Sequence, residues 1–222
     1  MTVKKNGAIF LSCKAYTLFY LIHIMVLEYI TNIYGKINLC TLKGVSIKWK
    51  KKKEKFFKSI KRRDPAARYA LQILLTYPGV KAIIWYRVAH FFFSKLHLKL
   101  IGEMIAFITR KRTGIEIHPG CKIGRNLFID HGMGVVIGET ATIGDNCTMY
   151  HGVTLGAIAN KEVDGRRHPT IGSNVMLGAK ATILGPVTIG DNAKIGANSL
   201  VISDVKANEV LKAPLPKQKS DK

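Results

Sequence analysis

An apolar residue recurs at every sixth position through most of residues 117–201, and this spacing restricts the folds available to the chain. A period of six matches neither the turn of an α-helix nor the simple alternation of a β-strand. It is typical of a parallel β-helix, in which each coil of about 18 residues forms three short strands with one inward apolar side chain each. The positions that carry the period are Ile117, Ile123, Ile129, Val135, Ile137, Ile143, Met149, Leu155, Ile171, Leu177, Ile183, Ile189, Ile195 and Val201.

Two interruptions break the period. Its phase slips by two residues between Ile129 and Ile137, and 16 residues separate Leu155 from Ile171. The second interval is one six-residue step with ten residues added, so we expect a loop at about 156–170 that leaves the coil. The sequence therefore predicts a β-helix over residues 113–206, followed by a tail over residues 207–222.

Residues 64–112 are expected to form a helical block that caps one end of the β-helix. Asp64 followed by Pro65 is typical of a helix start, with an N-cap acceptor before a proline at the first helical position. The expected helices span residues 66–76, 80–94 and 96–111. The predicted fold class is therefore α+β, a helical block followed by a parallel β-helix.

Residues 1–63 form a basic, partly apolar leader. They carry 15 Lys and Arg against 2 Asp and Glu, a net charge of +13, whereas residues 64–222 carry +8. The charge-free run from Ala15 to Leu27 is shorter than the roughly 20 apolar residues of a bilayer span. The basic run Lys48–Arg63 is either a patch for a membrane surface or nucleic acid, or a solvated linker; alternatively, translation begins further downstream.

Cysteine usage and charge also bear on location and partners. The four cysteines include no C-x-x-C pair, which argues against a disulfide scaffold and indicates a reducing compartment, so we expect a cytoplasmic protein. Because most of the positive charge lies in the leader, we expect no nucleic-acid partner, while the leader could still hold the protein at a membrane surface. We also expect residues 1–60 to be dispensable for catalysis, because Asp64 could begin a domain.

Three histidines lie at or near the interruptions, where a regular coil usually places function. His131 lies at the slip, and His168 ends the expected loop. His151 follows His131 by 20 residues, which is one coil once the two-residue slip is removed, so the two should stack. An imidazole can take a proton from a hydroxyl when a carboxylate holds its tautomer. Glu116, about one coil back, is a better orienter of His131 than Asp130, whose side chain should point to the other face.

Several segments resemble bacterial serine O-acetyltransferases, a family of hexapeptide-repeat acyltransferases. The resemblance covers about residues 60–205. The segments are Asp64-Pro65-Ala66-Ala67-Arg68, Leu74-Leu75-Thr76-Tyr77-Pro78-Gly79, Gly114-Ile115-Glu116-Ile117-His118-Pro119-Gly120, Ile129-Asp130-His131-Gly132-Met133-Gly134-Val135-Val136-Ile137-Gly138-Glu139-Thr140 and Arg167-His168-Pro169. The resemblance implies a left-handed β-helix and transfer of acetyl from acetyl-CoA to the hydroxyl of L-serine, for cysteine biosynthesis. Acetyl-CoA would be a co-substrate, with no tightly bound cofactor and no metal.

The resemblance also implies roles for individual residues. His131 corresponds to the general base of the family, and Glu116 to the acidic residue that orients it. The residues that hold serine correspond to Asp64, Asp130, Arg167 and His168. The acetyl-CoA groove corresponds to Ala157, Ala179, Lys194 and Ala197. Since no cysteine or serine has a nucleophile's setting, we expect direct transfer without an acyl-enzyme. A homotrimer or a dimer of trimers is expected, in which Asp130, His131 and His168 need not come from one chain.

The sequence departs from the family pattern in places, and two other functions stay open. His151 replaces an expected glutamine, the loop at 156–170 is longer, and the chain ends in Lys222 where the family's docking tail for cysteine synthase ends in isoleucine. The first alternative is another hexapeptide acetyltransferase with a sugar or xenobiotic acceptor, which would not need Asp64. The second is a metal-dependent β-helix lyase of the carbonic anhydrase type, but no third histidine has the coil spacing that a zinc site needs.

Overall fold

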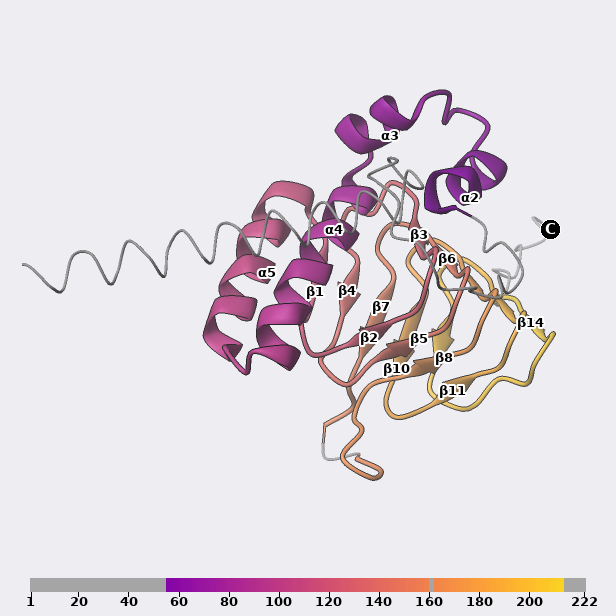
Figure 1. Ribbon diagram of the computed structural model, residues 1–222. Coiled ribbons are helices and arrows are strands. Elements are labelled where there is room, and N and C mark those ends of the chain that lie inside the picture. Colours follow the sequence, from indigo (N-terminus) through magenta and orange to yellow (C-terminus); the bar gives the residue numbers. More distant parts are fainter. Residues whose placement is uncertain (1–54, 160–161, 214–222) are drawn as a thin grey trace, which may run out of the picture. The chain divides into compact units, whose positions relative to one another are not determined.

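The computed structural model describes residues 55–159 and 162–213 (Figure 1). Predictions about residues 1–54 and about the chain end at Lys222 lie outside the described residues. The chain divides into two compact units, Met1–Lys58 and Ser59–Lys222, and the account below concerns the second. Within the described part, no helix combines the length and apolar character needed to span a bilayer.

Among the described residues, five helical segments precede the strands. They are α2 (Phe56–Arg63), α3 (Ala70–Thr76), α4 (Pro78–His90), a π-helical turn η1 (Phe91–Lys95) and α5 (Lys99–Thr113). The expectation that a helix starts at Pro65 is wrong, because Asp64 Oδ1 accepts a hydrogen bond from the Ala66 amide at 2.8 Å and closes a turn instead. Helix α5 ends at Gly114, whose φ of 69° is the left-handed conformation that glycine adopts easily.

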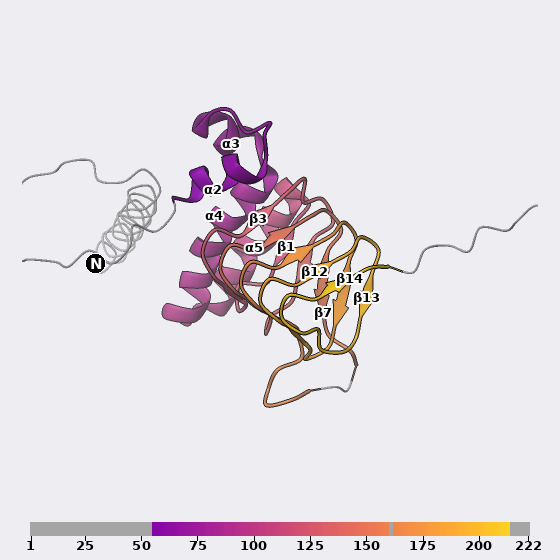
Figure 2. The same cartoon turned by 90° about the vertical axis from the view of Figure 1, so that its right-hand side faces the viewer.

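In the described part of the chain, fourteen short parallel strands follow and form three sheets (Figures 1 and 2). Sheet A contains β1 (Glu116–Ile117), β4 (Val136–Ile137), β7 (Thr154–Gly156), β10 (Thr182–Leu184) and β13 (Leu200–Val201). Sheet B contains β2 (Lys122–Ile123), β5 (Thr142–Ile143), β8 (Thr170–Ile171) and β11 (Thr188–Ile189). Sheet C contains β3 (Phe128–Ile129), β6 (Thr148–Met149), β9 (Met176–Leu177), β12 (Lys194–Ile195) and β14 (Val210–Leu211). The chain visits A, B and C in turn, once in each coil, as the expected left-handed parallel β-helix of hexapeptide repeats requires.

The strand register records both interruptions of the repeat. Ile171 pairs with Ile189, a regular coil of 18 residues. Ile117 pairs with Ile137 across an interval of 20, which contains the two-residue slip. Ile143 pairs with Ile171 across an interval of 28, which contains the ten added residues. The slip therefore lies at the C–A corner between β3 and β4, and the loop lies at the A–B corner between β7 and β8.

One side chain per strand fills the core of the β-helix. Leu155, Leu177, Ile183, Ile189 and Ile195 are each 0% exposed. Burial of such a side chain contributes about 1.5–3 kcal/mol, which explains why the six-residue period persists over so many turns. The coil also continues beyond its expected end at residue 206, because β14 pairs with β12 and uses part of the predicted tail.

Helices α4 and α5 lie side by side at the β1 end of the β-helix and cap it, as predicted (Figure 1). Gly102 of α5 allows the close approach, since a Cβ there would come within 2.9 Å of the Ala89 carbonyl oxygen. At the start of α4, a Cβ on Gly79 would overlap the carbonyl oxygen of Ile129. The first turn of α4 is therefore fixed beside the end of β3, next to Asp130.

Arg63 joins the end of α2 to the B–C corner of the β-helix. Its Nη1 donates to the Cys147 carbonyl at 2.8 Å and to Thr148 Oγ1 at 3.0 Å, and its Nη2 donates to the Asn126 carbonyl at 2.6 Å. The compact unit accordingly begins at Ser59, five residues before the expected boundary at Asp64. Since Asp64 follows Arg63 directly, this anchor also sets the position of Asp64.

Candidate active site

His131 occupies a strained turn on the C–A corner. Its φ is 58°, an uncommon value for a residue with a side chain, and the Gly132 amide donates to the Asp130 carbonyl at 2.6 Å across it. Gly132 has a φ of 78°, a left-handed conformation that favours glycine, and a Cβ there would lie 2.5 Å from Ile115 Cδ1. The two-residue slip thus produces a tight turn that leaves the His131 side chain exposed to solvent.

His151 lies directly beside His131 on the next coil. Their ring centroids are 6.2 Å apart with an interplanar angle of 77°, which confirms the predicted stacking. The His151 carbonyl accepts a hydrogen bond from the Lys180 amide of the following coil at 2.9 Å. A column of polar side chains therefore runs along this corner, with His131 at the end nearest the helical block.

Glu116 does not orient His131 in this structure. Its Oε2 forms an ion pair with Arg110 Nη1 at 2.9 Å, because the last turn of α5 places that cation above β1. Within the described residues, no hydrogen bond joins Glu116 to His131. The expected dyad is therefore absent from this arrangement of a single chain, although catalytic hydrogen bonds often form only when substrate is bound.

Two of the expected serine-binding carboxylates converge on a tyrosine. Tyr77 Oη donates to Asp64 Oδ2 at 2.5 Å. Burial, the hydrogen bond and charge of Asp64, and the charge of Asp130 raise the pKa of Tyr77 to about 12. Its hydroxyl therefore stays protonated and remains a donor. Sequence reasoning gave Tyr77 no role, although it lies in a segment that carries the family resemblance.

Arg167 and His168 lie at the other edge of sheet A. They follow the loop at the A–B corner, and His168 contacts Thr140, three residues after β4. His131 lies on the C–A corner, five residues before β4. One chain thus brings Asp64 and Asp130 near Tyr77, but it places His168 at the edge of the sheet opposite to His131.

The residues expected to bind acetyl-CoA are also divided between the C–A corner and the A–B corner. Ala179 and Ala197 lie on the C–A corner in successive coils, where the Asn198 amide donates to the Ala179 carbonyl at 2.9 Å. Lys194 is exposed on β12 of sheet C, close to that corner. Ala157 begins the loop at the A–B corner, so a single chain does not bring it to the other three.

Neither described cysteine has the properties of a nucleophile. Cys121 and Cys147 are buried, and burial raises their pKa to about 12 and about 11. A thiol with so high a pKa forms almost no thiolate at neutral pH. Among the described residues, no three His, Cys, Asp or Glu side chains are grouped as metal ligands.

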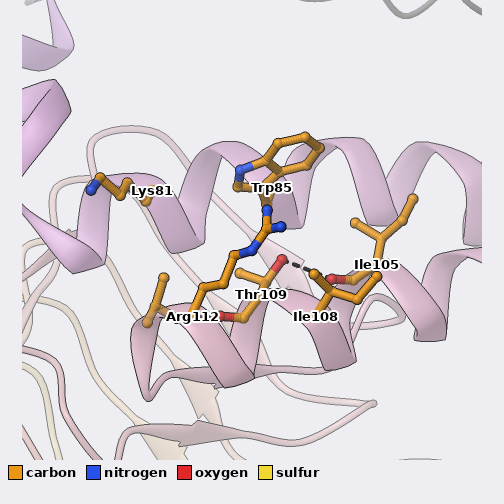
Figure 3. Close-up of a pocket in the computed structure, with 7 residues that line it drawn as sticks. Lys81, Trp85, Ile105, Ile108, Thr109 and Arg112 are labelled. Carbon is orange, nitrogen blue, oxygen red and sulfur yellow. Dashed lines mark hydrogen bonds between the residues drawn. The ribbon is translucent and has the colours of Figure 1, made fainter.

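A cavity of about 410 Å³ lies between α4 and α5 (Figure 3). Lys81 and Trp85 reach it from α4, and Ile105, Thr109 and Arg112 reach it from α5. None of the expected site residues lines it. The cavity therefore belongs to the helical block and not to the candidate active site.

Comparison with known proteins agrees with the geometry. Residues 168–203 match the family described as bacterial transferase hexapeptide (six repeats), and residues 134–158 match the hexapeptide repeat of succinyl-transferase. The chain is 53% identical over 142 residues to a serine acetyltransferase of Helicobacter pylori, covering 64% of this chain and 81% of that protein. It is 49% identical over 152 residues to a serine acetyltransferase of Synechococcus elongatus, covering 68% of this chain and 61% of that protein.

Solved structures give the same result. The serine acetyltransferase of Neisseria gonorrhoeae in complex with serine has a TM-score of 0.66 at 39% identity, covering 72% of this chain and 64% of that one. The enzyme of Brucella abortus in complex with coenzyme A has a TM-score of 0.67 at 34% identity, covering 72% of this chain and 63% of that one. Together with the β-helix, the left-handed turn at His131 and the two aspartates that act on Tyr77, these similarities establish that the chain belongs to the serine acetyltransferase family.

Proposed function

We propose that this protein transfers the acetyl group of acetyl-CoA to the hydroxyl of L-serine, giving O-acetyl-L-serine and free CoA. The observation that carries the proposal is that Asp64 and Asp130 both act on Tyr77, and that Asp130 directly precedes the exposed His131, in a chain of this family. Solved structures of relatives in complex with serine and with coenzyme A support both substrates. The product implies a place in cysteine biosynthesis.

In the proposed reaction His131 acts as the general base. Its imidazole removes the proton of the serine hydroxyl while the hydroxyl oxygen attacks the thioester carbonyl carbon. The carbon–sulfur bond then breaks, and the CoA thiolate takes the proton back from the imidazolium. A positioned base of this kind contributes about 10²–10⁴-fold to the rate. Because the acetyl group passes directly between the two substrates, no enzyme nucleophile is needed.

The charged residues supply the orientation that the attack requires. Asp64 and Asp130 present two carboxylates to the serine ammonium, and Tyr77 fixes one of them by its hydrogen bond. Arg167 and His168 bind the carboxylate side of the substrate. Glu116 would orient His131 once its carboxylate releases Arg110 and accepts a hydrogen bond from the His131 imidazole. Opposed anchors of this kind hold a small amino acid in one attack geometry.

We further propose that the working unit is a trimer, alone or paired through the helical block. The C–A corner of one chain would then face the A–B corner of its neighbour, bringing His131 and Ala179 of one copy to His168 and Ala157 of the next. Exposed apolar side chains on the β-helix support such packing: Met176, Leu200, Ile202 and Val210 are 37–63% exposed. Light scattering that finds a fully active monomer would contradict this arrangement.

The acceptor specificity tests the function. Initial rates of thiol release from acetyl-CoA are measured with L-serine, D-serine, L-homoserine and a panel of amino sugars. The proposal predicts that L-serine is preferred over every sugar by at least about 100-fold in kcat/KM, because only an α-amino acid engages both sets of anchors. Preference for a sugar or another xenobiotic acceptor would favour the alternative acetyltransferase function. A cytoplasmic location and binding to cysteine synthase remain further expectations.

A further inference from the structure

The hydrogen bonds around His168 specify which of its ring nitrogens carries the proton. Thr140 Oγ1 lies 3.0 Å from the backbone nitrogens of Arg167 and of His168, and 2.8 Å from His168 Nδ1. The backbone N–H of Thr140 also donates to His168 Nδ1, at 3.2 Å. One threonine therefore holds both the end of the loop and the ring that follows it.

The donors and acceptors in this cluster can be assigned without ambiguity. A hydroxyl has two lone pairs and a single hydrogen. Both lone pairs of Thr140 Oγ1 accept amide hydrogens, so its own hydrogen is donated to His168 Nδ1. The Thr140 amide can only donate, and it donates to the same nitrogen. Nδ1 is thus an acceptor with two donors, and a neutral imidazole in this position must carry its hydrogen on Nε2.

We propose that Thr140 is a positioning residue that fixes His168 as the Nε2–H tautomer, so that His168 donates a hydrogen bond to a substrate oxygen. The inference rests on the proposed function for the identity of that oxygen, which belongs to the carboxylate or hydroxyl of L-serine. It gives the two histidines opposite roles, since His131 accepts a proton whereas His168 donates a hydrogen bond.

Space and exposure around Nε2 agree with this role. A Cβ on Gly138 would overlap Cδ2 and Nε2 of His168, so glycine at this position makes room for the ring edge. Among the described residues Nε2 has no hydrogen-bond partner. Nor is it sealed in the interior, because Ser199 Oγ is the single buried side-chain polar atom left unpaired in the described part of the chain. The Nε2–H group is therefore available to a ligand.

The surrounding charges keep the ring neutral. Burial, and next the positive charge of Arg167, lower the pKa of His168, while Glu139 raises it and His118 lowers it. Protonation would also place a hydrogen on Nδ1, facing the Thr140 amide N–H, a donor that cannot turn away. The ring is therefore neutral at pH 7, and its single N–H is the one on Nε2.

The first test reads the tautomer directly. The full-length protein is labelled with ¹⁵N-histidine, solid-state NMR spectra are recorded near pH 7.5, and the His168 signals are assigned by their loss in His168→Gln. We expect a protonated Nε2 and an unprotonated Nδ1 in the wild-type protein. A protonated Nδ1 would overturn the proposal, and this measurement needs no enzymatic activity and no variant of Thr140.

The second test compares Thr140→Val, Thr140→Ser and, as a matched control, Thr188→Val, which alters the exposed residue of strand β11. Thr140→Val should lower kcat/KM for serine about tenfold or more, leave the KM for acetyl-CoA within about threefold, and give a mixed His168 tautomer. Thr140→Ser, which keeps the hydroxyl, should retain the wild-type kcat/KM for serine and the Nε2–H tautomer of His168. Thr188→Val should change neither of these two quantities.

The outcomes separate this inference from the proposed function. A wild-type protein without serine-dependent thiol release would refute the proposed function, while the NMR result would still decide the tautomer. If Thr140→Val keeps the Nε2–H tautomer and kinetics within about twofold of the wild type, Thr140 does not position His168. A Thr140→Ser variant that fails to restore the tautomer would equally contradict the assignment.

Discussion

His131 and His168 lie at opposite edges of sheet A within one chain, one on the C–A corner before β4 and the other on the A–B corner after it. A small substrate such as serine cannot touch both edges of the sheet in a single copy. If both histidines act on one serine, they must come from different chains. The proposed trimer meets this requirement, because it places the C–A corner of one chain against the A–B corner of its neighbour.

Shared sites predict complementation between inactive chains. His131→Asn and His168→Gln are each expected to be inactive or nearly so when expressed alone. Mixed trimers contain interfaces at which the first variant supplies His168 and the second supplies His131. In every mixed trimer, whether its composition is 2:1 or 1:2, one of the three interfaces carries both intact histidines, so the doubly purified trimers should recover about one third of the wild-type activity. Co-expression with two different affinity tags, followed by rate measurement on doubly purified trimers, tests this. Mixed trimers that stay inactive would indicate that both histidines act within one chain.

Substitution of His131 separates its chemical role from its backbone role. Asparagine is a better replacement than alanine, because it tolerates the left-handed conformation that the φ of 58° requires. We expect His131→Asn to fold normally and to lower kcat by about 10²–10⁴-fold, with a smaller effect on either KM. His151→Asn is the matched control on the neighbouring coil and should retain most of the activity. Circular dichroism and light scattering check assembly. A His131→Asn protein with nearly normal kcat would remove His131 from the mechanism.

The ion pair between Glu116 and Arg110 predicts different results for its two members. Glu116→Gln should lower kcat about tenfold, since it removes the charge that orients His131 but leaves the base in place. Arg110→Met should keep kcat within about twofold, because this exposed pair contributes little stability and its loss frees the carboxylate. The two variants are compared in steady-state assays at saturating serine. If Arg110→Met lowers kcat as much as Glu116→Gln, the pair itself is needed for activity.

The Arg63 anchor changes the expected limit of the dispensable segment. A protein of residues 55–222 should keep kcat/KM for serine within about tenfold of the full chain. A protein that starts at Asp64 should lose stability and serine affinity, because Ser59, Ile60 and Arg63 belong to the compact unit. In the full chain, Arg63→Met should cost about 2–4 kcal/mol of unfolding free energy, since several hydrogen bonds to one charged group are lost.

The control for this prediction is Lys61→Met, which alters an exposed cation of the same helix and should change little. Unfolding free energies come from denaturant titration of the assembled protein, and KM values from the same preparations. An Arg63→Met protein as stable as the wild type would show that the α2 anchor does not fix the position of Asp64. A large loss of activity in residues 55–222 would show that the preceding segment contributes to the site.

The β-helix could be predicted from sequence because its period is a local property. Each coil repeats the same inward position, so the 18-residue spacing between Ile171 and Ile189 is enough to predict that they pair. The two interruptions could be predicted in the same way, since they appear as a two-residue slip and a ten-residue addition in the six-residue period. The stacking of His131 on His151 followed from the same arithmetic.

Features that depend on contacts between distant segments could not be read in this way. Asp64 has the local pattern of a helix cap, but its second oxygen binds Tyr77, and the helix begins only at Ala70. Arg63 looks like one cation in a basic run, but the carbonyl groups that it binds on the β-helix lie more than 60 residues away. The sequence around Thr140 does not predict its contact with His168, because that contact forms only when the end of the loop folds back beside Thr140.

The identity of the acetyl acceptor tests the central claim most directly. Purified full-length protein is incubated with acetyl-CoA and L-serine, and free CoA and O-acetyl-L-serine are quantified together by mass spectrometry, with His131→Asn in parallel. The account predicts one O-acetyl-L-serine for each CoA released by the wild type, with both products reduced by about 10²-fold or more in the variant. Release of CoA that does not depend on serine, or serine acetylation that persists in His131→Asn, would contradict it.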